Sequence, residues 1–175
     1  ITWEDKTAGL EISIQYLLDA HGILKVNSKV TNIADGDYTL EHLLNWLPLA
    51  PQADEILDFY GHWTKERQPQ RREIGYGLTT REGFEGRSGH DYTITQIALT
   101  KATNFNQGEA WSMGVAWSGN NIHHVEKLID RSKSIGAGEY LLPGEVILGK
   151  GESYEAPAVI AGYSANGDRK STRLN

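Results

Sequence analysis

Large apolar and small side chains alternate along residues 110–118, and this period of two constrains the fold more than any other feature of the chain. Trp111, Met113, Val115 and Trp117 share one parity, and the residues between them are small. Successive side chains of a strand point to opposite faces of a sheet. The segment therefore predicts a strand with one buried face, and we expect Trp111 and Trp117 to pack in the core on that face.

The same alternation recurs in short segments along the whole chain, separated by turns in which Gly, of which there are 19, is common. Two hairpins are predicted, one at Asp19–Gly22 and one at Gly119–Asn121. The predicted strands cover residues 10–16, 24–30, 38–46, 55–63, 92–99, 110–118, 123–131, 140–142, 146–148 and 158–163.

Three segments are less regular. A helix over residues 38–47 is an open alternative to the strand there, and Pro48 and Pro51 are expected to end either one. Residues 65–91 predict a long loop with only short strands near Ile74 and Thr79. Residues 134–139 predict a glycine-containing connection.

These patterns predict an all-β fold, a two-layer antiparallel β-sandwich, because many short strands without a long helix must bury their apolar faces against one another. The chain opens at Ile1 without an initiator Met, and residues 168–175 resemble the in-frame translation of a common sequencing-library adapter. We expect one domain over residues 1–167, incomplete at both ends, followed by an adapter-derived tail.

Composition narrows the partners. The net charge of −6 argues against nucleic acid or an anionic membrane. No apolar run approaches the roughly 20 residues that a membrane-spanning helix needs. The chain has no Cys, which excludes disulfides and thiolate metal sites.

No catalytic or cofactor motif stands out. The 23 Asp and Glu show no distinguished pair, and the six His lack the i, i+4 spacing of helical zinc sites. Nucleophile-elbow, P-loop and dinucleotide-binding motifs are missing from the sequence. We expect no metal and no cofactor. His90 lies in the sharp loop 86–91, where Asp91 could fix its ring; a purely structural turn is the alternative.

The segment 61–72 has the composition of an interface. It combines Trp63 with a carboxylate and four Lys or Arg residues at the end of the apolar run 56–60. A buried indole ring and guanidinium groups that meet fixed carboxylates or carbonyls suit a polar contact between domains.

Five motifs in order resemble the amino-terminal domain of glycoside hydrolase family 36, the α-galactosidases of bacteria and plants. They are Gly61-x-Trp63-x-x-Glu66-Arg67 with Arg71 and Arg72, Arg81-Glu82-Gly83 leading to Gly86-Arg87-Ser88-Gly89-His90-Asp91, Trp117-Ser118-Gly119-Asn120, Leu141-Leu142-Pro143-Gly144-Glu145 with Gly149–Pro157, and Tyr163-Ser164-Ala165-Asn166-Gly167. The resemblance covers nearly the whole chain.

The resemblance implies a β-supersandwich domain that is not itself catalytic. Its role would be to support a (β/α)₈ barrel of the same protein and to help assemble a homo-oligomer, while the missing barrel hydrolyses terminal α-galactosyl residues of oligosaccharides with retention. It also implies a cytoplasmic location. The interface candidates are Trp63, Glu66, Arg67, Arg71, Arg72, Arg87, His90, Asp91 and Asn120.

Two other functions remain open from the residues. A free-standing carbohydrate-binding sandwich could stack a sugar on Trp63. A purely structural oligomerisation module would need neither sugar nor barrel.

Overall fold

The computed structural model describes residues 1–91 and 95–167, which form 15 strands and no helix. The strands are β1 (Thr2–Asp5), β2 (Leu10–Leu18), β3 (Leu24–Asn32), β4 (Tyr38–Leu40), β5 (Asn45–Leu49), β6 (Glu55–His62), β7 (Lys65–Glu73), β8 (Gly77–Gly83), β9 (Thr95–Leu99), β10 (Ala110–Val115), β11 (Asn121–Lys127), β12 (Lys133–Glu139), β13 (Val146–Leu148), β14 (Ser153–Glu155) and β15 (Val159–Ser164).

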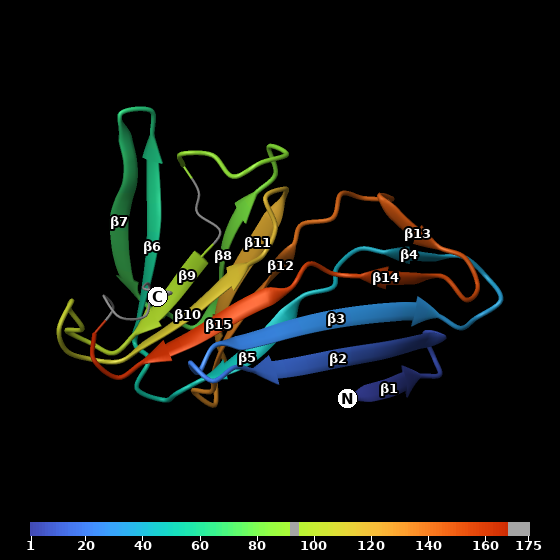
Figure 1. The fold of residues 1–175 in the computed structure, drawn as a ribbon, viewed down its shortest axis with the longest axis horizontal. Coiled ribbons are helices and arrows are strands. Elements are labelled where there is room, and N and C mark those ends of the chain that lie inside the picture. Colours follow the sequence, from blue (N-terminus) through green and yellow to red (C-terminus); the bar gives the residue numbers. More distant parts are fainter. Residues whose placement is uncertain (92–94, 168–175) are drawn as a thin grey trace.

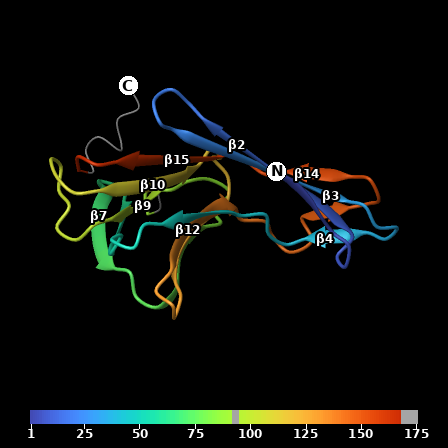
Figure 2. The same ribbon diagram turned by 90° about the horizontal axis from the view of Figure 1, so that it is seen from below.

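The strands form two layers, as predicted (Figures 1 and 2). The first layer is a nine-stranded sheet in the order β1-β2-β3-β15-β10-β9-β6-β7, with β14 also paired to β3. The four-stranded sheet β5-β12-β11-β8 and the two-stranded sheet β13-β4 lie against it. Every pairing between these strands is antiparallel.

Two apolar clusters hold the layers together. The larger one joins the nine-stranded and four-stranded sheets, and Met113 and Val115 of β10 are part of it with Trp111 packed against them. The smaller one joins β2 and β3 to the two-stranded sheet through residues such as Val30 and Leu148. The alternation along β10 therefore predicted its buried face correctly.

Trp117 is an exception. β10 ends at Val115, and the Trp117 side chain is 42% exposed, so its predicted core position is wrong. The indole instead lies over Gly119, where an added Cβ would meet the ring nitrogen at 2.5 Å.

The predicted hairpin of residues 10–16 and 24–30 is confirmed as β2 and β3. The single strand expected over 38–46 is wrong, and so is the alternative helix, because β4 and β5 are separate strands of different sheets. Pro48 lies inside β5 and does not end it. β5 is an edge strand, where the missing N–H of a proline is tolerated.

Residues 65–91 contain two strands of seven or more residues, β7 and β8, where the sequence predicted a long loop with short strands near Ile74 and Thr79. Thr79 lies in β8, whereas Ile74 lies outside any strand. β7 pairs with β6 along nearly its whole length. It is an edge strand and is polar on both faces, so it has none of the hydrophobic alternation by which a half-buried strand is recognised.

The predicted hairpin between residues 110–118 and 123–131 is also wrong. β10 belongs to the nine-stranded sheet and β11 to the four-stranded sheet, so the turn at Gly119–Asn121 carries the chain from one layer to the other. Residues 134–139 form most of β12, not a connection. The Trp46 ring lies on Gly136 of β12, where an added Cβ would stand 2.6 Å from the indole.

Near the end of the chain, strands are confirmed at 146–148 and 159–164, whereas the strand predicted over residues 140–142 is wrong, because these residues lie outside any strand. The strand predicted over residues 92–99 corresponds to β9. Residues 92–94 of that prediction lie outside the described residues, and so does the predicted tail over residues 168–175. No helix long and apolar enough to cross a membrane occurs in the part of the chain that the structure describes.

His124 of β11 is a buried titratable group on the four-stranded sheet. Its ring stacks on Trp46 with centroids 5.4 Å apart, and its Nδ1 lies 3.0 Å from the Thr80 hydroxyl. Burial lowers the pKa of His124, and the charge of His42 lowers it further, although nearby glutamates act in the opposite direction.

We expect this histidine to make the domain less stable in acid. A base whose folded pKa is depressed binds more protons when unfolded, so stability falls as the pH drops through the ordinary histidine pKa of about 6.5. His124→Gln should reduce the slope of unfolding free energy against pH between about 7 and 5, measured by urea denaturation. His21→Gln, at an exposed turn, is the matched control, and an equal change of slope in the two variants would contradict the role of His124.

Candidate docking surface

The β6–β7 hairpin presents the most exposed aromatic ring of the predicted interface. The hairpin stands at one end of the large sheet, with its turn directed away from the other strands (Figure 1). Trp63, in the turn, is 74% exposed. The turn requires Gly61, whose φ is 157° and whose added Cβ would stand 2.9 Å from the Glu66 Cα. Thr64, at φ 71°, completes the reversal.

Trp63, Glu66 and His90 come together at this turn. The Trp63 and His90 rings meet edge to face with centroids 5.7 Å apart. The His90 Nδ1 lies 3.8 Å from the Glu66 Oε1. That carboxylate also accepts the Thr64 N–H at 2.9 Å. Backbone N–H donors, first that of Glu66 itself and then that of Thr64, lower the pKa of Glu66, and the nearby His90 contributes.

The loop that carries His90 is held from the other side by the Trp117–Asn120 turn. Asn120 Oδ1 accepts the Gly86 N–H at 2.7 Å, and the Ser118 carbonyl accepts the Ser88 N–H at 3.3 Å. Two motifs 30 residues apart in sequence thus form one structure. The sequence suggested Asp91 as the partner of the His90 ring, but the structure pairs the ring with Glu66.

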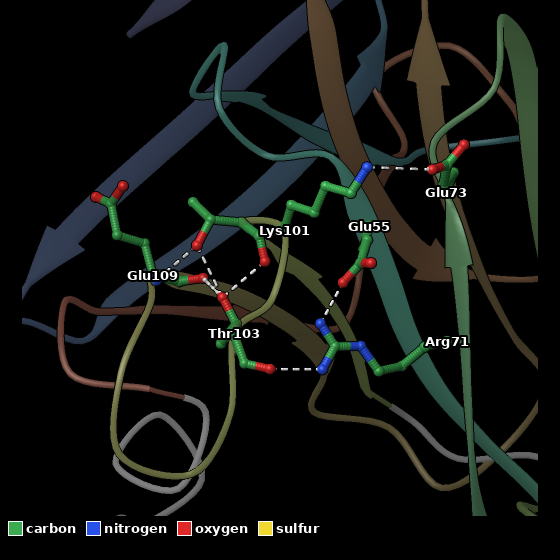
Figure 3. A network of polar contacts seen from close by, with 7 residues as sticks. Glu55, Arg71, Glu73, Lys101, Thr103 and Glu109 are labelled. Carbon is green, nitrogen blue, oxygen red and sulfur yellow. Dashed lines mark hydrogen bonds and ion pairs between the residues drawn. The ribbon is translucent and has the colours of Figure 1, made fainter.

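Arg71 of β7 is bonded within the domain. Its guanidinium donates to the Glu55 carboxylate and, through Nη1, to the Thr103 carbonyl at 2.6 Å (Figure 3). Lys101 lies in the loop between β9 and β10, as Thr103 does, and its ammonium group pairs with the Glu73 carboxylate at 3.9 Å on the surface. Arg71 therefore ties the β6–β7 hairpin to the loop between β9 and β10.

Arg72 is bonded within the domain as well. Its Nη2 donates to the Asp58 Oδ2 at 2.8 Å, and the Arg81 Nε lies 3.6 Å from the same oxygen. Whether Arg71 and Arg72 also touch a partner stays a prediction. Arg67 and Arg87 are exposed, and neither forms an ion pair with any other described residue.

Sequence reasoning missed the partners of Arg71 and Arg72, which are Glu55, Thr103 and Asp58, and it missed that Arg81 shares Asp58 with Arg72. Asp58 offered one signal, since it is the single charged residue in the apolar run 56–60. Within residues 1–91 and 95–167, no cluster of three or more His, Asp or Glu could hold a metal ion. The surface combines an exposed indole, exposed cations and a fixed loop, which suits binding of a macromolecular partner.

The chain matches the family model described as the glycosyl hydrolase family 36 N-terminal domain over residues 1–149. It belongs to that family. The sequence is 34% identical over 167 residues to an alpha-galactosidase of Escherichia coli, and this alignment covers 95% of the chain and 24% of the relative.

Solved structures agree with the family assignment. The galactosidase domain of an alpha-galactosidase–sucrose kinase superposes with a TM-score of 0.85 at 27% identity, covering 95% of this chain and 23% of that one. An alpha-galactosidase of Lactobacillus brevis gives a TM-score of 0.86 at 21% identity with the same coverage, which supports the fold alone. The chain thus spans about a quarter of the length of these relatives.

The structural unit extends past the end of the family match. The match stops at residue 149, yet β15 lies between β3 and β10 in the large sheet. The large sheet of this chain is therefore continuous only when residues 159–164 are included.

Proposed function

We propose that this chain is the non-catalytic N-terminal domain of an α-galactosidase that hydrolyses terminal α-galactosyl residues of oligosaccharides. The observation that carries the proposal is the match to the family 36 N-terminal domain together with 95% coverage of this chain by a quarter of the Escherichia coli alpha-galactosidase. A cytoplasmic location and a homo-oligomeric parent are part of the proposal.

The described residues support a role in docking. They contain no metal-binding cluster, and the exposed aromatic ring Trp63 is presented on a sterically restricted turn. Indole and guanidinium groups carry much of the energy of protein interfaces. We propose that Trp63, Arg67 and Arg87 face the (β/α)₈ barrel of the parent protein or a neighbouring subunit.

A chimera tests the function. Residues 1–167 of this chain would replace the aligned region of the Escherichia coli alpha-galactosidase, with which they share 34% identity. We expect the chimera to hydrolyse an aryl α-galactoside. The same enzyme without the aligned region, and this chain alone, should show no turnover. Turnover by the isolated chain, or an inactive chimera that is folded by circular dichroism, would contradict the proposal.

Trp63→Ala in the chimera tests the docking surface. Loss of a central interface tryptophan typically weakens association by about 2 kcal/mol or more. We expect the chimera to inactivate at a lower temperature, with residual galactosidase activity as the measurement, while the melting temperature of the isolated chain stays unchanged. Trp3→Ala removes a 44% exposed indole on β1 and is the matched control. Equal behaviour of the two variants would exclude Trp63 from the interface.

A further inference from the structure

Asp58 is the most unusual acidic residue of the domain. It lies in the middle of β6, only 3% exposed, and is the one Asp or Glu among the buried residues that the structure describes. A carboxylate is removed from water at high cost unless cations and donors compensate for it. The contacts of Asp58 therefore indicate its structural role.

One oxygen of Asp58 serves two strands in different layers. Its Oδ2 accepts from Arg72 of β7 at 2.8 Å and lies 3.6 Å from the Nε of Arg81 on β8. β7 belongs to the nine-stranded sheet and β8 to the four-stranded sheet. A single carboxylate thus fixes the end of one sheet relative to the other.

Arg81 extends this link to the loop that carries His90. Its Nη2 donates to the Asp91 carbonyl at 2.9 Å and approaches the Phe59 carbonyl at 3.4 Å. The residue before Asp91 is His90, whose ring meets Trp63. The contacts therefore form a closed circuit from β6 through Asp58 and Arg81 to the His90 loop, and back through Trp63 to the hairpin.

The hydrogen bonding of Asp58 and Arg72 is incomplete, so these charges are a weak source of stability. Asp58 Oδ1 and Arg72 Nε are buried and have no hydrogen-bond partner among residues 1–91 and 95–167. Apolar residues of similar volume often stabilise a fold at least as well as such buried ion pairs, and fixed geometry is one reason to retain the charges.

We propose that Asp58 is a positioning residue: through Arg72 and Arg81 it sets the separation of the β6–β7 hairpin and the His90 loop, so that Trp63 and His90 form one preorganised docking surface. The inference rests on the proposed function for the role of that surface. The arrangement itself can be tested without a partner. Preorganised contacts bind more tightly because less freedom is lost on association.

The first test uses the full chain. Asp58→Asn keeps the shape of the side chain and removes its charge. In the unsubstituted chain we expect nuclear Overhauser cross-peaks between the ring protons of Trp63 and His90. In Asp58→Asn we expect these cross-peaks to be lost, with the far-ultraviolet circular dichroism unchanged. Asp54→Asn makes the same change at an ion-paired aspartate in the turn between β5 and β6, and should keep the cross-peaks. Cross-peaks that persist in Asp58→Asn would overturn the inference.

Asp58→Leu covers the case in which the asparagine variant does not fold. It removes the carboxylate and supplies apolar volume, so we expect a folded chain that also lacks the Trp63–His90 cross-peaks. A folded Asp58→Leu chain with the cross-peaks intact would equally contradict the positioning role.

The second test uses the chimera and separates the two proposals. Asp58→Asn should lower the inactivation temperature as Trp63→Ala does, and the double variant should be no worse than Trp63→Ala alone, because both act through one surface. Additive losses would overturn the positioning role and leave docking intact. Cross-peaks lost without any change in the chimera would instead count against docking at this surface.

Discussion

Lys133→Met is expected to lower the free energy of unfolding by about 2–4 kcal/mol. Lys133 is on β12, and its side chain is only 5% exposed. Its ammonium group donates to the Pro51 carbonyl at 3.0 Å, the Ala53 carbonyl at 2.5 Å and the Asp54 Oδ1 at 3.0 Å. All three donors of the group are used.

The loss has two parts. Ala53 is fully buried, so its carbonyl would be left without a donor in a place that water does not reach. The β5–β6 connection would also lose its link to β12. Methionine fills most of the lysine stem volume, so a cavity contributes little. We expect a fall in melting temperature of about 4–16 °C for a domain of this size.

Lys101→Met is the matched control. Lys101 pairs with Glu73 at 3.9 Å, but both side chains are at least three-quarters exposed, and such pairs contribute little. Denaturant unfolding of both variants measures the difference. A Lys133→Met protein as stable as Lys101→Met would show that the three contacts add no stability.

Gly108→Ala is expected to destabilise the domain by about 2–4 kcal/mol. Gly108 has φ 96°, a conformation that costs an alanine about 1 kcal/mol or more. An added Cβ would also stand 2.8 Å from the Thr103 Cα and clash with the Thr103 hydroxyl. Thr103 is only 1% exposed and cannot move aside easily.

The clash would spread along the network of Figure 3. The Thr103 carbonyl accepts from Arg71, and the Gly108 carbonyl accepts the Gly167 N–H at 2.8 Å. Gly144→Ala is the control, since it has φ 74° with nothing within 4 Å of an added Cβ. It should cost only the conformational part. If chemical denaturation gives equal losses for the two variants, the steric account of Gly108 is wrong.

The sequence predicted the elements whose side chains alternate. β3 and β10 each bury one face of a sheet, and Leu10, Ile12 and Ile14 of β2 pack into the core from one face, so the period of two is visible in their residues. β7 could not be found in this way, because Pro69 is the only residue in it without a polar side chain, and β6 supplies its hydrogen bonds. β7 therefore forms because it pairs with β6, and its own residues carry no pattern that predicts a strand.

The composition of the sequence predicted which residues form the candidate docking surface. It did not predict which of those residues contact one another. Trp63 and His90 were singled out separately, and only the fold brings their rings together. Arg72 was expected to reach outward, whereas β6 places the buried Asp58 beside it. A carboxylate inside an apolar run is a signal of such a partner, but the sequence does not say which cation it will meet.

The position of β15 has a consequence for how the chain acquires its fold during synthesis. β15 leaves the ribosome after every other described strand of the large sheet, and it is inserted between β3 and β10, where Val159 pairs with Val26 and with Val115. Until it emerges, the two halves of the large sheet have no shared strand, and contacts this distant in sequence form slowly. Nascent chains that stop before residue 159 should therefore expose unpaired edges of β3 and β10 to chaperones.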